Sequence, residues 1–243
     1  MKLFLLTILF SCSAYAVELY VAPAGSNANP VAAMAQQKPK LQLAEGAWQF
    51  YPAASRHPGR SRVLLIGDSI VNGYRSNVIK ALGDTVDVDV WLTPLHENSP
   101  QLHSDLQAVL RQGPYDVIHF NIGLHGWEAG SIPEGRYVPL MKEYISILRK
   151  EAPQAKLIWA SSTPVTEPGK PELNRQINPT IAERNSLAAE VMLKNGIAVD
   201  DLYSLIVGKL DLSAGDRFHW KPESYKILSE AVATQIRAKL PSR

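Results

Sequence analysis

Cysteine is almost absent from this sequence of 243 residues, which contains a single one, Cys12. A disulfide within the chain is therefore excluded, and packing has to supply the stability of the fold. Acidic and basic residues nearly cancel, and the formal net charge of +2 gives no indication of nucleic-acid binding. Beyond the N-terminal residues no segment is long and apolar enough to cross a bilayer, so we expect no transmembrane segment in the mature chain.

Metal-binding motifs are also missing. The six histidines form neither a His-Glu-x-x-His nor a His-x-x-His pattern. Asp87 and Asp89 fall on one face of a predicted strand, but no partner motif accompanies them. We therefore expect neither a metal nor another cofactor.

The first sixteen residues are typical of a secretory signal peptide. Met1-Lys2 precedes an apolar run that is too short to span a bilayer, and Ala14-Tyr15-Ala16 then fits the A-x-A cleavage pattern. We predict that residues 1–16 are removed and that the protein is exported to the periplasm or the extracellular space. The alternative is a lipid anchor at Cys12, which follows the apolar run, but Phe10 is bulky for a lipoprotein cleavage site.

Residues 17–60 differ from the rest of the chain. They are rich in alanine, proline, glutamine, glycine and asparagine, and they show no sustained helical or strand period. We predict an N-terminal arm that lies on the surface of the following domain. That domain comprises residues 61–243 and is long enough to bury one sizeable core.

From Arg62 onward, short apolar segments alternate with amphipathic helical segments, which is typical of a parallel sheet covered by helices on both faces. The predicted strands comprise residues 63–66, 86–91, 117–121, 157–160 and 197–199. The predicted helices comprise residues 76–82, 102–111, 138–150, 179–195 and 222–240. Pro179 and Pro222 suit first-turn positions, and Gly196 suits the end of a helix.

A candidate nucleophile follows the first predicted strand. Gly67-Asp68-Ser69 begins where the strand ends, and ligands of open α/β sheets bind outside those carboxyl ends. Backbone N–H groups at the start of the next helix are suited to stabilise an oxyanion. Gly-Asp-Ser also occurs in ordinary turns, and Val71 excludes the Gly-x-Ser-x-Gly pattern. A serine hydroxyl needs a base before it acts as a nucleophile.

A candidate base lies just before the last predicted helix. Asp216 and His219 are three residues apart, so in a turn the carboxylate reaches one imidazole nitrogen while the other faces the serine. Taken alone, Asp-x-x-His is equally compatible with a loop in which the aspartate caps the turn. Together with the serine at a strand end, the spacing predicts a triad of Ser69 as nucleophile, His219 as base and Asp216 as the group that orients it.

The early Gly-Asp-Ser block and the late Asp-x-x-His block resemble those of the GDSL/SGNH hydrolase family, and the similarity extends over residues 62–240. The resemblance implies a three-layer α/β/α sandwich with a mainly parallel, flavodoxin-like sheet of five strands. It also implies hydrolysis of esters through an acyl-enzyme, without a metal or other cofactor.

The groups that face the oxyanion depart from the family pattern, which uses the serine N–H, a glycine N–H and the asparagine of Gly-x-Asn-Asp. After the second strand no glycine is found, but Glu97-Asn98 resembles one branch of the family and makes Asn98 a candidate. The stretch from Asn121 through Gly123 to His125 resembles the Asn-x-Gly-Leu-His of the same branch. His125 takes the place of the asparagine and is the favoured donor, since a neutral imidazole donates one hydrogen bond. Asn121 is the alternative.

Other residues near these blocks are predicted to support the site. Residues 161–165 and Arg184-Asn185 are similar to the same branch and are expected to line or brace the crevice. We interpret His119 as a histidine packed in the sheet. Three aromatic residues near the blocks are interpreted as packing residues in preference to sugar platforms, namely Tyr74, Trp127 and Trp220.

The favoured function is that of an esterase that removes O-acyl groups, chiefly O-acetyl groups, from an acylated carbohydrate or another small ester. The carbohydrate follows from the family resemblance, from export, and from a short similarity of residues 19–26 to the segment that precedes some β-helix domains of polysaccharide-active enzymes. Two alternatives stay open. One is an acyltransferase that acts on an envelope polysaccharide, and the other is an inactive carbohydrate-binding protein with this fold. The sequence leaves the oligomeric state undetermined.

Overall fold

A six-stranded sheet forms the centre of the computed structural model, which describes residues 41, 43 and 48–242. The strand order is β1-β3-β2-β4-β5-β6, and every neighbouring pair is parallel except β1 with β3. The strands are β1 (Gln49–Tyr51), β2 (Ser61–Gly67), β3 (Val86–Leu92), β4 (Val117–Phe120), β5 (Lys156–Ala160) and β6 (Ala198–Asp200). The predicted α/β class is confirmed, and all five predicted strands are present.

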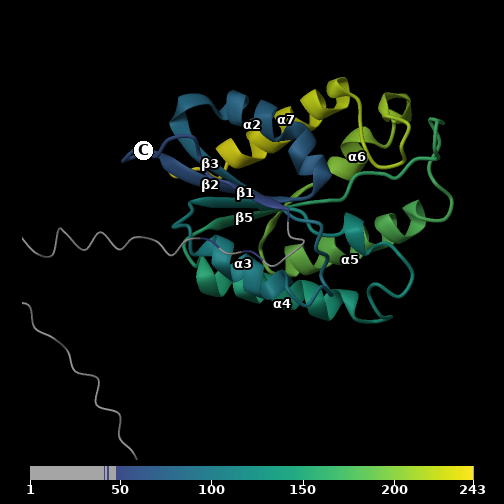
Figure 1. The fold of residues 1–243 in the computed structure, drawn as a ribbon, viewed down its shortest axis with the longest axis horizontal. Coiled ribbons are helices and arrows are strands. Elements are labelled where there is room, and N and C mark those ends of the chain that lie inside the picture. Colours follow the sequence, from purple (N-terminus) through teal and green to yellow (C-terminus); the bar gives the residue numbers. More distant parts are fainter. Residues whose placement is uncertain (1–40, 42, 44–47, 243) are drawn as a thin grey trace, which may run out of the picture. The chain divides into compact units, whose positions relative to one another are not determined.

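Helices cover both faces of the sheet (Figure 1), with α2, α6 and α7 over one face and α3, α4 and α5 over the other. The helices are α2 (Ser69–Leu82), α3 (Leu102–Leu110), α4 (Tyr137–Glu151), α5 (Asn178–Lys194), α6 (Leu202–Ile206) and α7 (Pro222–Arg237). One buried apolar cluster fills the space between the sheet and each helical layer. The predicted three-layer sandwich is therefore confirmed.

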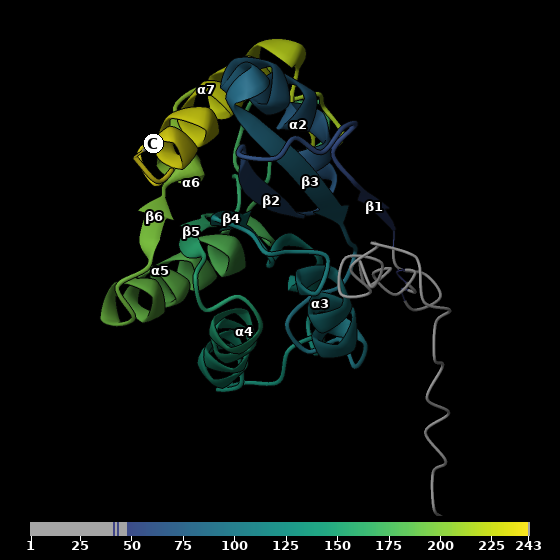
Figure 2. The same cartoon turned by 90° about the vertical axis from the view of Figure 1, so that its left-hand side faces the viewer.

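Strand β1 corrects two expectations. It lies within residues 17–60, which were assigned to an arm, and it pairs with β3 so that Gln49 lies opposite Leu92. The sheet therefore has six strands instead of five, with β1 and β6 at its two edges (Figure 2). A strand of three residues is too short to show the alternation that identifies a strand in a sequence. The predicted signal peptide, Cys12 and most of the predicted arm lie outside the described residues.

The segment between β1 and β2 is tied to the sheet by Asp89 of β3, which is fully buried. Its carboxylate accepts hydrogen bonds from the Ala53 N–H at 2.8 Å, from Arg56 at 2.9 Å and from Arg62 at 2.8 Å. The hydroxyl of Tyr115 donates a further bond at 2.9 Å. A buried carboxylate requires such partners because its desolvation is costly. This network makes the segment part of the domain.

Helix α2 begins immediately after β2, ahead of the predicted start at residue 76. The side chain of Asp68 caps it by accepting the Ile70 N–H at 2.8 Å. Gly73 is a weak helix former within the first turns, so the sequence favours a later start although Ile70, Val71 and Tyr74 already follow the helical period. A Cβ at Gly73 would lie 2.2 Å from the ring of Tyr225, so glycine is needed for α7 to approach α2.

Candidate active site

Ser69 lies at the junction of β2 and α2, as the sequence predicts, and its hydroxyl faces His219. The chain turns sharply after Gly67, where a Cβ would lie 2.2 Å from Cγ2 of Val71. The Asp68 cap then makes Ser69 the first residue of α2. Oγ of Ser69 lies 2.9 Å from Nε2 of His219, which is a hydrogen-bonding distance.

The turn that ends at His219 aligns the other half of the triad. Oδ2 of Asp216 lies 2.6 Å from Nδ1 of His219, while Oδ1 accepts the backbone N–H groups of Phe218 at 3.2 Å and of His219 at 2.8 Å. Arg217 adopts a φ of 88°, in the left-handed region, which bends the chain tightly between the two groups. The structure thus brings Ser69, Asp216 and His219 together as one hydrogen-bonded chain.

The pKa of Asp216 is lowered from its ordinary value. Partial burial raises this pKa, but the hydrogen bonds from the backbone N–H and the ring of His219, together with the attraction of the imidazolium, outweigh burial. Asp216 is therefore ionised at neutral pH and holds the proton of His219 on Nδ1. Nε2 is then free of a proton and is able to accept one from the Ser69 hydroxyl.

A pocket of about 360 Å³ opens at the triad. It is lined by Trp48, Ser69, Leu124, His125, Trp127, Phe218 and His219. The rings of Trp127 and Phe218 pack against each other with centroids 6.2 Å apart. The sequence analysis missed Trp48, Leu124 and Phe218 as wall residues, and it assigned Trp127 to packing. The pocket therefore combines a polar reaction centre with largely apolar walls, as ligand sites commonly do.

His125 lies in the same pocket as Ser69. Its ring packs edge-on against Trp48, with centroids 5.4 Å apart and an interplanar angle of 87°. Its Nε2 atom is buried and has no hydrogen-bond partner among the described residues. The structure therefore places the ring of His125 at the pocket, and its role as an oxyanion donor stays a prediction.

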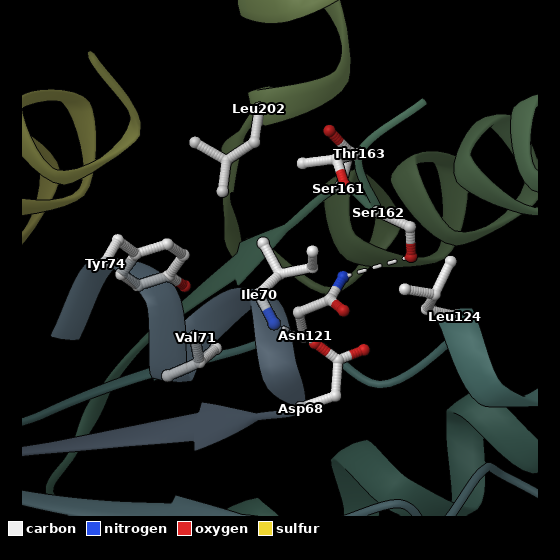
Figure 3. A pocket seen from close by; sticks show the side chains of 10 residues that line it. All are labelled: Asp68, Ile70, Val71, Tyr74, Asn121, Leu124, Ser161, Ser162, Thr163 and Leu202. Carbon is white, nitrogen blue, oxygen red and sulfur yellow. Dashed lines mark hydrogen bonds between the residues drawn. The ribbon is translucent and has the colours of Figure 1, made fainter. Parts of the chain in front are cut away.

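Asn121 occupies a separate position behind the nucleophile turn, where it lines a small cavity of about 10 Å³ together with Asp68 (Figure 3). Its Nδ2 donates to the carbonyl of Ala160 at 2.6 Å and to Oγ of Ser162 at 3.3 Å. The amide donors of Asn121 are thus engaged within the protein. The structure separates the two candidates, with His125 in the pocket of Ser69 and Asn121 among the braces beneath it.

Asn98 is not brought to the pocket, which corrects the expectation for this residue. Its side chain is exposed and donates to the carbonyl of Ser131 at 3.0 Å. The reason is a tight turn in which the His96 N–H donates to Oγ of Ser99 at 2.9 Å and the Ser99 N–H donates to the His96 carbonyl at 2.8 Å. This turn leaves Asn98 at the surface and buries its neighbour Glu97.

Glu97 is a residue whose importance the sequence analysis missed. It is only 1% exposed, and neither carboxylate oxygen has a hydrogen-bond partner among the described residues. Burial raises its pKa to about 7, against the opposing effects of its own backbone N–H and of Arg184. The only signal in the sequence was the resemblance of Glu97-Asn98 to one branch of the family.

Gly123 separates Glu97 from Ser162 directly before the short helical turn Leu124–Gly126, which carries His125. A Cβ at Gly123 would lie 3.0 Å from Oγ of Ser162 and 3.6 Å from Oε1 of Glu97. A side chain at this position would therefore crowd Oγ of Ser162, which accepts a hydrogen bond from Asn121. Gly123 lies beside the pocket. Because it has no side chain, the loops that carry Glu97 and Ser162 can approach each other closely there.

Several residues that the sequence predicts to brace the site or to pack in the core are found in these positions. The side chain of Asn185 makes two hydrogen bonds with the backbone of Ser162, both at 2.9 Å, which confirms the predicted brace. His119 is fully buried in the sheet, and its Nε2 lies 3.0 Å from Oδ2 of Asp200. Two of the three aromatic residues interpreted as packing are buried in the core, namely Tyr74 and Trp220.

Within residues 48–242, no three histidine, cysteine, aspartate or glutamate side chains gather in an arrangement suited to a metal ion. In the same part of the chain, none of the helices combines the length and the apolar character that a bilayer-spanning helix requires.

No family model matches the chain, and no curated protein matches it. Solved structures do match. An aryl esterase from M. smegmatis is 18% identical, with a TM-score of 0.61 over 74% of this chain and 100% of that chain. A carbohydrate acetylesterase from Sinorhizobium meliloti is also 18% identical, with a TM-score of 0.61 over 74% of this chain and 99% of that chain.

These likenesses concern the fold, because the identities are below the level at which sequence alone relates two proteins. The match covers practically the whole of both solved structures, so this chain contains their complete fold and additional residues. The resemblance first found in the Gly-Asp-Ser and Asp-x-x-His blocks is thereby confirmed at the level of architecture. The chain has the fold of these two esterase structures, which is the three-layer architecture that the GDSL/SGNH resemblance implies.

Proposed function

We propose that the protein is a serine ester hydrolase that removes O-acyl groups through an acyl-enzyme, with O-acetyl esters of carbohydrates as the favoured substrates. One observation carries this proposal: hydrogen-bonding distances link Asp216, His219 and Ser69 in a continuous chain at the wall of a pocket. A serine hydroxyl is a weak nucleophile at neutral pH unless a base takes its proton. His219 is in position to act as that base.

The reaction starts when Oγ of Ser69 attacks the ester carbonyl carbon while Nε2 of His219 takes the hydroxyl proton. The tetrahedral intermediate then collapses to an acyl-Ser69, and His219 gives its proton to the departing alcohol. Water attacks the acyl-enzyme with His219 again as base, which releases the carboxylic acid and restores Ser69. Asp216 stabilises the imidazolium in both halves of the reaction.

The oxyanion of the intermediate needs hydrogen-bond donors close to Ser69. The N–H of Ser69 is the first of α2, has no partner within the helix and lies at its positive end. We assign a second donor to His125, which lines the pocket, over Asn121, whose amide is engaged elsewhere. The loop of Gly123 completes this side of the substrate site.

The pocket walls support a substrate alcohol with an apolar face. Trp48, Trp127 and Phe218 present aromatic rings, and the apolar face of a sugar ring packs well on such rings. A solved structure of the same fold is named a carbohydrate acetylesterase. Both observations favour an acetylated carbohydrate over an ester that has no ring.

Hydrolysis is favoured over transfer to a sugar acceptor because water has access to the triad. The side chain of His219 is 42% exposed and that of Asp216 is 54% exposed. An acyltransferase has to keep water from its acyl-enzyme, and this open arrangement offers no such protection. The intact geometry of the triad likewise disfavours a protein that binds carbohydrate without activity.

Export belongs to the same proposal, and it rests on the predicted signal peptide of residues 1–16. An exported esterase meets acetylated envelope or extracellular polysaccharides directly. Recovery of the protein from the periplasm or the medium with Val17 at its N-terminus would support this proposal. Attachment of lipid to Cys12 would instead support the membrane-anchored alternative.

The test of the proposed activity is hydrolysis of p-nitrophenyl acetate and of an acetylated sugar by the mature protein. Ser69→Ala should lose activity by at least roughly a thousandfold, since a triad without its nucleophile keeps only residual catalysis. Ser76→Ala is the matched control, because Ser76 is exposed on the same helix, α2. Equal rates for the wild type and Ser69→Ala would overturn the proposal, and transfer in excess of hydrolysis with an added unacetylated sugar would overturn the hydrolase assignment.

A further inference from the structure

Glu97 is a buried ionisable residue that lies beside the proposed oxyanion loop and has no part in the proposed mechanism. The turn of residues 96–99 points it inward, and both of its oxygens are shielded and without a hydrogen-bond partner among the described residues. Oε1 lies close behind Gly123, 3.6 Å from where a Cβ on that glycine would be. A buried acid in such a place affects the loop either by its shape or by its charge.

The surroundings of Glu97 contain one permanent positive charge. Arg184 of α5 acts on Glu97 through its charge, but it donates its hydrogen bond to the carbonyl of Gly126. From α4, Tyr137 and Tyr144 face Glu97 with hydroxyls that burial keeps protonated. Arg184 also lies over the ring of Tyr137, with its guanidinium carbon 5.5 Å from the ring centroid.

Two histidines also belong to the charged and titratable groups around Glu97. His96 precedes Glu97 in the turn, and burial followed by the charges of Arg184 and His125 lowers its pKa. His125 lies on the loop that Arg184 holds. Arg184 therefore links the buried acid to the loop that presents a proposed oxyanion donor.

We propose that Glu97 is a positioning residue for the proposed ester hydrolysis: as a neutral acid it supports the loop from Gly123 to Gly126, and its ionisation weakens that support. The inference rests on the proposed function. An ionised Glu97 attracts Arg184 away from the Gly126 carbonyl, and it places a negative charge behind the loop that has to stabilise the oxyanion. Both effects act in the same direction, so the neutral form is the more active one.

The size of the charge effect follows from Coulomb's law. Two like charges about 10 Å apart, at an effective dielectric constant near 20, repel strongly enough to slow a reaction roughly tenfold. Because burial raises the pKa of Glu97 to about 7, the ionised form becomes populated within the pH range in which esterases are assayed.

The experiment compares the wild type with Glu97→Gln, which keeps the shape of the neutral acid and does not ionise. The ratio of the variant's kcat/KM to that of the wild type cancels the pH dependence that both proteins share. We expect this ratio to stay near one at about pH 5.5 and to rise to roughly tenfold at about pH 8.5. Glu143→Gln, at an exposed position of α4, is the matched control and should give a flat ratio.

A second readout needs no catalysis. In the wild type, the backbone amide resonances of residues 123–126 should shift with a midpoint near pH 7, and this step should be missing from Glu97→Gln. A ratio that is flat with pH, or loop resonances that titrate identically in both proteins, would overturn the role of Glu97. If the wild type hydrolyses no ester, the proposed function fails, and the resonance titration still decides whether Glu97 controls the loop.

Discussion

Replacing Glu97 by glutamine removes a buried acid whose ionisation opposes folding, so the free energy of unfolding should respond to pH differently in the two proteins. Burial raises the pKa of Glu97 from 4.5 to about 7 in the folded protein. The folded state therefore holds the proton more tightly than the unfolded chain does. The resulting stabilisation is fully present below about pH 4.5 and is lost as the pH rises through about 7.

The magnitude follows from the difference between the two pKa values. A shift of about 2.5 units corresponds to about 3 kcal/mol, because each unit is worth about 1.4 kcal/mol. Glu97 is almost completely buried, so solvent screening does not reduce this figure much. For a domain of this size, about 3 kcal/mol corresponds to a shift of roughly 6 to 12 °C in Tm.

The assay is thermal or urea unfolding of both proteins at a series of pH values between about 4.5 and 8.5. Relative to Glu97→Gln, the wild type should lose about 3 kcal/mol of stability across this range. The difference in the free energy of unfolding between the two proteins at each pH cancels the contribution of every titratable group that they share. A stability difference that stays constant with pH would refute the reasoning, since it would mean that Glu97 ionises equally easily in the folded and unfolded chains.

Three further predictions concern the triad, the pocket and the helix interface. Asp216→Asn should lower kcat roughly 10² to 10⁴-fold, because an asparagine no longer holds the imidazole in the tautomer required of a base; circular dichroism should show an unchanged fold. Trp48→Ala should raise KM for aryl and sugar esters roughly tenfold with little change in kcat, and Trp48→Phe should restore most of the loss. Gly73→Ala should destabilise the protein by roughly 1 to 3 kcal/mol in thermal unfolding, because its Cβ would lie 2.2 Å from the ring of Tyr225. Gly208→Ala is the control, since no atom lies within 4 Å of a Cβ there.

The parallel sheet could be predicted because its strands are buried on both faces and therefore read as uninterrupted apolar runs, as in β2. Strand β1 could not, because three residues carry no period, and its attachment depends on Asp89, whose partners are spread along the sequence. The start of α2 was missed because Gly73, a weak helix former, follows the Asp68 cap within the first turns of the helix. Sequence patterns therefore located the strands and helices that have a sustained apolar pattern. They missed β1 and the start of α2, whose positions depend on individual contacts.

The triad was predictable for a different reason. Asp216 and His219 lie three residues apart, so their spacing predicts the contact between them. Ser69 follows the carboxyl end of β2, which is the edge of the sheet where ligand sites of this fold class form. The placement of Asn98 depends on a turn closed by His96 and Ser99, which no spacing rule reveals. The family resemblance indicated the correct segment, but only the geometry shows that the segment buries its glutamate.

Two of the three aromatic residues of the pocket wall come from segments that carry no member of the triad, and this bears on the choice of substrate. Trp48 precedes β1, Trp127 follows the turn after β4, and Phe218 comes from the turn that carries the base. Solved structures with this fold include an aryl esterase and a carbohydrate acetylesterase, so the shared fold by itself does not select between aryl and sugar esters. Substitutions in the walls should therefore change the ratio of kcat/KM for an acetylated sugar to that for p-nitrophenyl acetate, whereas Asp216→Asn should lower both values equally. If wall variants left the ratio unchanged, selection of the alcohol would have to lie outside this pocket.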